Sequence, residues 1–181
     1  MKTSNQVYSS NPLSNTENQR KLRTNPKKNN YKRIPFNRRL GRLTLQVTIT
    51  TNEFDPWTTL AAYNVRHDIG ATATFVGTMR DYNKGDIVKA MFLEHYPSMT
   101  EKYLHKISEI AFQRWDIIDT LIIHRVGDIQ PGDNIVLIAV WAGHRAPAFD
   151  ACRFLIEELK FKAPFWKCET LKDGTRWIDK N

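Results

Sequence analysis

Apolar and polar residues follow two rhythms in the part of the chain that begins at Leu43, and the first predicts strands. The segment 43–50, LTLQVTIT, alternates apolar and polar residues, as a half-buried strand does. The segment 134–143 is a longer apolar run, typical of a buried strand. The polar segments 80–86 and 127–133 are predicted to be turns. The full set of predicted strands is 43–50, 70–79, 87–96, 117–126, 134–143, 164–171 and 175–179.

The second rhythm places apolar residues three or four positions apart, and it predicts helices. Asp55 is expected to cap the first helix, with Pro56 at its first position. Ser98 and Glu101 have the spacing of a capping box at the start of the second helix. Pro164 ends the third helix. The predicted helices are 55–66, 98–115 and 146–161. Strands and helices mix without a regular strand–helix–strand repeat, which favours an α+β fold.

Charge divides the chain into two parts. Residues 1–42 hold eleven Lys and Arg residues against the single acid Glu17, out of 27 basic and 19 acidic residues in the whole chain. The remaining 16 basic and 18 acidic residues give residues 43–181 a net charge of −2. The first segment has too few apolar residues to offset the entropy of ordering. We therefore predict a disordered basic tail over 1–42 and one folded domain over 43–181.

The basic tail leaves three interpretations open. It is a targeting segment, an electrostatic contact with RNA or a membrane surface, or a solvated extension. A nucleic-acid-binding module acting through this tail is therefore the alternative function. The sequence shows no apolar run of 18 residues and no secretory signal, so we expect a cytoplasmic protein without a membrane span.

The two cysteines, Cys152 and Cys168, predict free thiols rather than a disulfide framework. No pair of Cys or His residues has the spacing of zinc ligands, so we expect no metal and no resident cofactor.

Lys160 stands out by its phase on the third predicted helix. At 100° per residue, Phe149, Ile156 and Lys160 fall within about 40° of one another. The pattern predicts that Lys160 extends the apolar face. One interpretation is a lysine that complements the helix dipole and extends its amine to water. The other is a partly desolvated amine that acts as nucleophile or proton carrier.

The strand after this helix carries a second lysine. Alternation along 165–170 puts Phe165, Lys167 and Glu169 on one face and the residues between them on the other. The turn at Pro164 can bring Lys160 and Lys167 to one pocket. Lys162 has no comparable argument and is predicted to be solvated.

Three more cationic or cationisable residues stand at the ends of predicted elements. His144 and Arg145 lie where a buried strand meets a helix N-terminus, a natural site for an anion, although a core histidine and a paired arginine fit the same spacing. Arg80 leaves a strand into a polar turn, where its guanidinium can bind a phosphate or carboxylate. His124 and Arg125 precede no helix and are predicted to be structural. The residues alone therefore indicate a site for an anionic substrate, with lysine chemistry possible.

Five motifs resemble, in order and spacing, those of the catalytic-subunit family of molybdopterin synthase. They span roughly Leu43 to Trp177, and they are FVGTMRDYNKGD, LEHYPSMTEK, IIHRVGDIQPGD, AGHRAPAFDA and LKFKAPFWKCE. The resemblance implies an α/β hammerhead-type fold with a mixed or antiparallel sheet and about three helices. It also implies a homodimer within a heterotetramer, in which each protomer binds a small ubiquitin-like sulfur-carrier subunit. The carrier's C-terminal Gly-Gly thiocarboxylate delivers sulfur to cyclic pyranopterin monophosphate, which forms the dithiolene of molybdopterin.

The same resemblance assigns roles to individual positions. Lys160 matches the family's essential lysine, and Lys167 matches its second active-site lysine. Arg176 resembles an arginine near the substrate that the dimer mate can supply. The remaining matches to substrate-binding positions and their pocket neighbours are Thr78, Met79, Arg80, His144, Arg145, Cys168 and Glu169.

Two positions depart from the family pattern. Gly143 replaces a commoner Ser, Pro or Ala, and Cys168 stands where a basic residue usually follows Trp-Lys. Cys168 raises the rival idea of a persulfide carried on this chain, although its surroundings offer no dedicated loop for a reactive thiol.

Overall fold

The computed structural model describes residues 45–63 and 66–178. The predicted tail 1–42 and the boundary at residue 43 lie outside this part. The elements in chain order are β1 (Leu45–Thr50), α1 (Pro56–Ala61), β2 (Ala71–Thr78), β3 (Tyr82–Asn83), β4 (Asp86–Ile87), β5 (Ala90–His95), α2 (Pro97–Arg114), β6 (Ile117–Arg125), β7 (Gly127–Ile129), β8 (Asn134–Ala142), α3 (Arg145–Lys162), β9 (Phe165–Leu171) and β10 (Gly174–Ile178).

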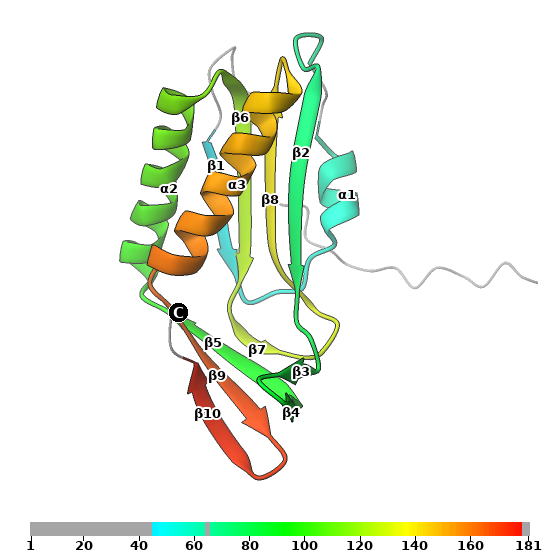
Figure 1. Cartoon of the computed structure of the whole chain (residues 1–181), viewed down its shortest axis with the longest axis vertical. Helices are drawn as coiled ribbons and strands as arrows, with labels where there is room; N and C mark the ends of the chain where they lie inside the picture. The colour runs from blue at the N-terminus through cyan, green and yellow to red at the C-terminus, as the bar shows by residue number, and fades with distance from the viewer. Residues whose placement is uncertain (1–44, 64–65, 179–181) are drawn as a thin grey trace, which may run out of the picture. The chain divides into compact units, whose positions relative to one another are not determined.

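The strands form two four-stranded sheets and one short ribbon (Figure 1). The first sheet has the order β1-β6-β8-β2, in which β1 pairs with β6 in parallel and the other pairs are antiparallel. The second sheet, β10-β9-β5-β7, is antiparallel throughout. The pair β3-β4 makes the ribbon. With its three helices, the described part of the chain confirms the predicted α+β class.

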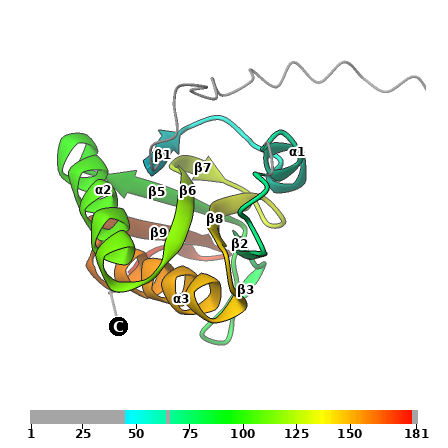
Figure 2. The ribbon, with the colours of Figure 1, turned by 90° about the horizontal axis from the view of Figure 1, so that it is seen from above.

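Helices cover both faces of the first sheet. α2 and α3 lie side by side on one face, and α1 lies on the other (Figures 1 and 2). The core beneath α2 and α3 includes Leu104, Leu155 and Ile138, all fully buried. On the α1 face, the ring of Tyr63 stacks on Trp141 with centroids 3.7 Å apart. Because side chains alternate along β6, one strand serves both cores.

The helix starts confirm one predicted cap and contradict another. Asp55 caps α1 by accepting hydrogen bonds from the backbone N–H of Trp57 at 3.3 Å and of Thr58 at 3.0 Å. The predicted capping box of α2 is wrong, because that helix begins at Pro97 and Tyr96 is its N-cap, with no side-chain cap. The Thr100 hydroxyl instead donates to the Tyr96 carbonyl at 2.9 Å. Proline at the first helical position needs no hydrogen-bond partner for its nitrogen, which makes this start workable.

Both predicted turns contain strand. The segment 127–133 includes β7, which pairs with β5, and the segment 80–86 includes most of the β3-β4 ribbon. The three strands β3, β4 and β7 are too short for periodicity to reveal, and β7 exists because β5 offers it an edge. None of the helices in the described residues is long and apolar enough to cross a membrane.

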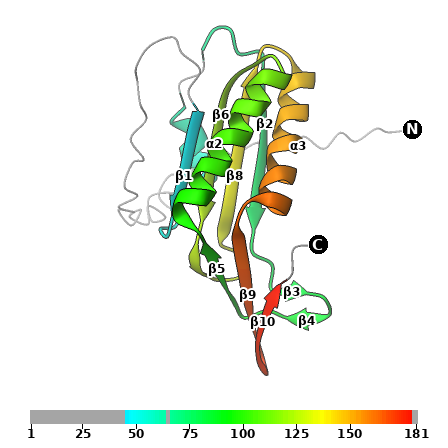
Figure 3. The same ribbon diagram turned by 90° about the vertical axis from the view of Figure 1, so that its left-hand side faces the viewer.

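The site residues depend on where the sheets and helices end. β8 ends where α3 begins, so α3 runs back along β8 and finishes near its start (Figures 1 and 3). β2 is antiparallel to β8, with Ala71 opposite Ala142 and Thr78 opposite Asn134. The C-terminal ends of β2 and α3 therefore lie at one end of the first sheet, next to the second sheet. The N-terminus of α3 lies at the other end.

Candidate functional site

Lys160 is in the last turn of α3, and its side chain is exposed. The buried stripe of this helix is Ala148, Ala151, Cys152, Leu155 and Leu159. Lys160 is about 140° around the helix from Leu155, whereas Phe149, which shares its face, is 66% exposed. The prediction that Lys160 extends the buried face, and with it the desolvated amine, is therefore wrong. Helical periodicity correctly put Lys160 and Phe149 on one face. Because Phe149 is exposed, its apolar side chain did not indicate the buried face.

The helix turn that carries Lys160 is nevertheless fixed. The Glu158 carboxylate accepts a hydrogen bond from Tyr103 of α2 at 2.6 Å and one from Lys162 at 2.7 Å. The Lys162 hydrogen bond, followed by that of Tyr103, lowers the pKa of Glu158. Lys162 remains 62% exposed, as predicted for a solvated lysine. The Nζ of Lys160 lies 5.4 Å from the ring centroid of Phe161, a cation–π distance.

Lys167 occupies β9 as the alternation predicted. Phe165 and Glu169 are buried and Lys167 is half-buried, while Trp166 is exposed on the opposite face. Lys167 pairs in register with Leu93 of β5 and, on its other side, with β10. Strand pairing on both sides holds the backbone of Lys167, whereas the hydrogen bonds of Glu158 hold the helix turn of Lys160.

The buried His124 packs against β9, the strand that carries Lys167. The ring of His124, on β6, stacks on Phe165 with centroids 3.9 Å apart. Its Nδ1 lies 2.8 Å from the Arg125 carbonyl oxygen, so this nitrogen carries the proton of a neutral ring. Burial, together with the smaller effects of the Lys167 and His95 charges, lowers the pKa of His124 to about 3, against the opposing hydrogen bond to the Arg125 carbonyl. His124 is thus a structural residue, as predicted.

A network of polar side chains ties the β3-β4 ribbon to β9 and β10. Glu169 accepts hydrogen bonds from Asn83 at 2.6 Å and from Arg176 at 2.8 Å. Arg176 also donates to Asp86 at 2.6 Å and to the Asn83 carbonyl at 3.2 Å. The hydrogen bond to Glu169, then that to Asp86, raises the pKa of Arg176. Both Arg176 and Glu169 therefore make internal contacts that the sequence reading did not foresee.

Sequence reasoning missed Asn83 and Asp86 in this network. The available signal was an acid and an amide in a polar turn, but nothing in the turn indicates which distant cation they meet. The sequence separation from Arg176 is 93 residues for Asn83 and 90 for Asp86.

Arg80 lies beyond the end of β2, exposed, and follows the buried Met79. Thr78, the last residue of β2, is exposed beside an irregularity in the strand pairing. A hollow of about 480 Å³ opens next to Arg80. Its lining residues are Met79, Arg80, Asp81, Tyr82, Pro131 and Gly132.

His144 and Arg145 stand at the start of α3, as predicted, and both are exposed. The backbone is tight here: a Cβ on Gly70 would meet the Gly143 carbonyl oxygen at 2.3 Å, so only glycine fits at 70. Arg145 and Lys160 are fifteen residues apart on one helix, which separates their Cα atoms by about 22 Å. Within one chain the structure therefore places Arg80, Lys160 and Lys167 at one end of the first sheet and His144 with Arg145 at the other.

The thiols agree with their predicted free state. Cys152 is buried in the core, and burial raises its pKa to about 11. Cys168 is half-buried on the face of β9 opposite to Lys167, in register with Phe92 and Trp177. Within residues 45–63 and 66–178, no group of three or more His, Cys, Asp or Glu residues is placed to hold a metal ion.

Comparison with known proteins decides the family. A family model described as MoaE protein matches residues 49–162 of this chain. The chain belongs to the MoaE family. The match covers Arg80, His144, Arg145 and Lys160, and it ends before Lys167. Membership in the MoaE family confirms the resemblance found in the sequence motifs.

Similar proteins with names support the same assignment. The molybdopterin synthase catalytic subunit of Ralstonia nicotianae is 52% identical over 134 residues, which cover 74% of this chain and 76% of that protein. The protein of the same name from Haemophilus influenzae is 47% identical over 135 residues, covering 75% and 90% of the two chains.

Solved structures of the MoaE family share the fold. The molybdopterin biosynthesis MoaE protein from Burkholderia ambifaria is 49% identical, with a TM-score of 0.64 over 76% of this chain and 90% of that one. Molybdopterin synthase from Staphylococcus aureus is 32% identical, with a TM-score of 0.66 over 75% of this chain and 96% of that one.

Proposed function

We propose that this MoaE-family chain is the catalytic subunit of a molybdopterin synthase, a sulfurtransferase of molybdenum cofactor biosynthesis. It moves sulfur from the thiocarboxylated Gly-Gly end of a small ubiquitin-like carrier to cyclic pyranopterin monophosphate, forming the dithiolene. The observation that carries the proposal is the placement of Arg80, Lys160 and Lys167 at the same end of the first sheet, in a chain of this family.

The electrostatics of that end suit two anionic reactants. A thiocarboxylate and a phosphate repel each other, and fixed cations lower the energy of bringing them together. Arg80 has the fork geometry that binds phosphate oxygens. Lys160 is exposed at a fixed helix end, so an arriving carrier tail can reach its amine. In this position Lys160 either transfers a proton or bonds transiently to the tail's terminal carbonyl.

His144 and Arg145 enter this proposal through a second copy of the chain. About 22 Å of helix separates Arg145 from Lys160 in one protomer, too far for both to contact one small substrate. A two-fold symmetric dimer offers each site the opposite end of its mate. We therefore place His144 and Arg145 of one copy beside Lys160 of the other, in a homodimer within a heterotetramer.

Replacement of Lys160 tests the function directly. Lys160→Ala is expected to reduce formation of molybdopterin from the precursor and thiocarboxylated carrier at least about 100-fold, since it removes a group that acts in the reaction. Lys162→Ala is the matched control, because Lys162 is a solvated lysine two residues away whose partner Glu158 keeps its bond to Tyr103. Full activity in Lys160→Ala, with the carrier still bound, would refute the proposal.

The alternative function concerns residues 1–42, whose eleven basic residues face one acid in the sequence. Phosphate-backbone binding by such a tail weakens steeply with salt. Deleting 1–42 is expected to leave synthase activity intact; loss of activity together with loss of salt-sensitive RNA binding would favour the alternative. A cytoplasmic location stays a prediction, supported by the bacterial relatives of the same name.

A further inference from the structure

Arg125, the last residue of β6, is a buried cation outside the set of residues assigned to the reaction. Only 9% of its side chain is exposed. It points to the opposite face of β6 from its neighbour His124, because strand side chains alternate. His124 therefore packs against β9, the strand of Lys167. Arg125 extends from the opposite face of β6 and makes a separate set of contacts.

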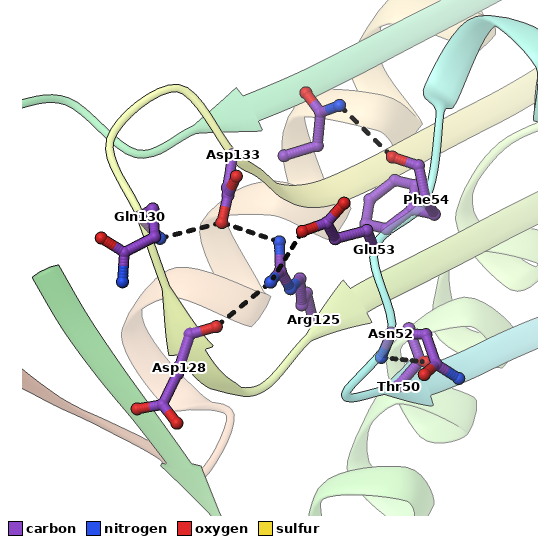
Figure 4. Close-up of polar contacts among 9 residues, drawn as sticks. Thr50, Asn52, Glu53, Phe54, Arg125, Asp128, Gln130 and Asp133 are labelled. Carbon is purple, nitrogen blue, oxygen red and sulfur yellow. Dashed lines mark hydrogen bonds and ion pairs between the residues drawn. The ribbon is translucent and has the colours of Figure 1, made fainter. Parts of the chain in front are cut away.

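The guanidinium of Arg125 holds the segment between β6 and β8 (Figure 4). Its Nη1 donates to Asp133 Oδ2 at 2.9 Å, and its Nη2 donates to the Asp128 carbonyl at 3.2 Å. The exposed carboxylate of Glu53 lies 3.7 Å from Nη2 and completes the set (Figure 4). The guanidinium thus binds this segment at Asp128 and at Asp133, five residues apart.

Asp133 passes this constraint to a tight turn. The same Oδ2 accepts a hydrogen bond from the Gln130 N–H at 2.8 Å, and the Asp133 N–H donates to the Gln130 carbonyl at 3.0 Å. Gly132 has φ of +91°, a conformation that favours glycine. Arg125 therefore fixes a turn whose shape depends on one shared carboxylate oxygen.

This turn is hydrogen-bonded to Met79, the residue before Arg80. The Met79 N–H donates to the Asp133 carbonyl at 2.9 Å, and the Gly132 N–H donates to the Met79 carbonyl at 2.9 Å. The strand pairing of β2 with β8 has already shifted at Gly77 and Thr78, so these two bonds set where the chain leaves the sheet. Met79 and Gly132 both line the hollow beside Arg80.

A buried ion pair is an expensive way to gain stability, because hydration lost by both charges offsets much of their attraction. A planar fork with several donors is well suited to fixing geometry. The route Arg125–Asp133–Met79 ends one residue from Arg80. We propose that Arg125 is a positioning residue that sets Arg80 for binding the anionic group of the substrate. The identity of that anion rests on the proposed function; the positioning does not.

A double-mutant cycle tests whether Arg125 acts through Arg80. In the complex with carrier, Arg125→Met is expected to raise the KM for the precursor about tenfold and to change kcat less than about twofold. In an Arg80→Ala background, the same change is expected to alter KM by less than about twofold, since the residue being positioned is gone. A double variant whose KM rises by the product of the two single-variant factors would overturn the proposal. Asp128→Asn is the control, because Arg125 bonds to the backbone carbonyl of Asp128 while the side chain of Asp128 is exposed, and its KM is expected to stay within about twofold.

A second measurement needs no turnover. Amide hydrogen exchange in the full chain is expected to quicken about tenfold or more at Met79 and Gly132 in Arg125→Met, and to stay unchanged at Ile138 in the core of β8. Arg125→Lys, which keeps the charge but loses the fork, is the second variant should the methionine variant unfold, and it is expected to quicken the same two amides. Unchanged exchange at Met79, or equal quickening at all three amides, would refute positioning. If the wild type makes no molybdopterin yet these amides respond, the proposed function fails and the positioning stands.

Discussion

The two ends of α3 differ in how much of their surroundings the chain itself supplies. At the C-terminal end, Glu158 joins Tyr103 and Lys162, and the nearby Arg176 and Arg125 hold a ribbon and a turn in place. At the N-terminal end, His144 is an N-cap without a side-chain cap, and it is exposed together with Arg145. One end is pre-organised in a single chain, whereas the other presents cations with few internal restraints. A residue of the site therefore need not find all of its surroundings in its own chain, and we infer that a second copy supplies what the N-terminal end of α3 lacks.

Mixed dimers give the largest contrast between the two ends. Homodimers of Lys160→Ala and of Arg145→Ala are each expected to be nearly inactive. After both chains are unfolded and refolded together, about half of the dimers contain one of each, and one of their two sites has both intact residues. The mixture is expected to recover about a quarter of wild-type molybdopterin formation.

The control for this experiment is the double variant Arg145→Ala with Lys160→Ala, refolded with the Lys160→Ala chain, which offers no intact site. A mixture of the two single variants that stays as inactive as this control would mean that Lys160 and Arg145 act within one protomer or not together.

Arg176 offers a sharper question about the pre-organised end. If it holds the ribbon, both Arg176→Met and Asp86→Asn are expected to raise the KM for the precursor about fivefold, because each breaks the same connection. If Arg176 instead contacts the substrate, freeing it by Asp86→Asn is expected to leave KM unchanged or lower it. Steady-state kinetics separate the two, with Lys172→Ala, an exposed change on the same hairpin, as the control.

The buried His124 makes the pre-organised end sensitive to acid. Its pKa is about 3 in the folded chain and about 6.5 unfolded, so between these values the unfolded state binds more protons. Stability is therefore full above pH 6.5 and falls, by on the order of 1 kcal/mol for each pH unit, as pH drops toward 3. His124→Gln is expected to flatten this dependence relative to the wild type. Urea unfolding at pH 7 and pH 5 measures it; parallel losses in both proteins would contradict the assignment.

The cysteines are expected to show the smallest effect. Cys168 lies on the face of β9 opposite to Lys167, and Cys152 is buried among apolar side chains. Replacing both by alanine is expected to keep molybdopterin formation within about twofold of the wild type. An inactive double variant that remains folded, by circular dichroism, would favour sulfur carried as a persulfide on this chain.

The sequence pattern predicted those features of the fold that depend on neighbouring residues, such as strand alternation and helix caps. The alternation over 165–170 placed Lys167 and Glu169 on the correct face, and Asp55 caps α1 as expected. The first helix nevertheless ends at Ala61, earlier than predicted. Propensity indicates where a helix can begin, but packing against the sheet determines how far it continues.

The candidate site was predictable only in part, because its long-range contacts carry no local signal. Phase put Lys160 with Phe149, yet an exposed aromatic residue and a core residue look alike in sequence. The predicted helix 146–161 already put Arg145 and Lys160 near opposite ends, but no pattern within one chain could indicate that a second copy brings them to one site, as we propose. The motif resemblance supplied the roles, and the structure supplied the distances that separate them.

The shared carboxylate of Glu158 also has a dynamic consequence. With Tyr103 on one helix and Lys162 on the other bonded to it, the end of α3 cannot swing without breaking a contact to α2. The backbone of Lys160 is then stationary on the timescale of side-chain rotation, which for an exposed lysine is picoseconds to nanoseconds. The side-chain amine of Lys160 therefore changes conformation on this timescale while the backbone beneath it stays in place. In the proposed function, an arriving carrier tail therefore meets a rapidly moving amine on a fixed backbone.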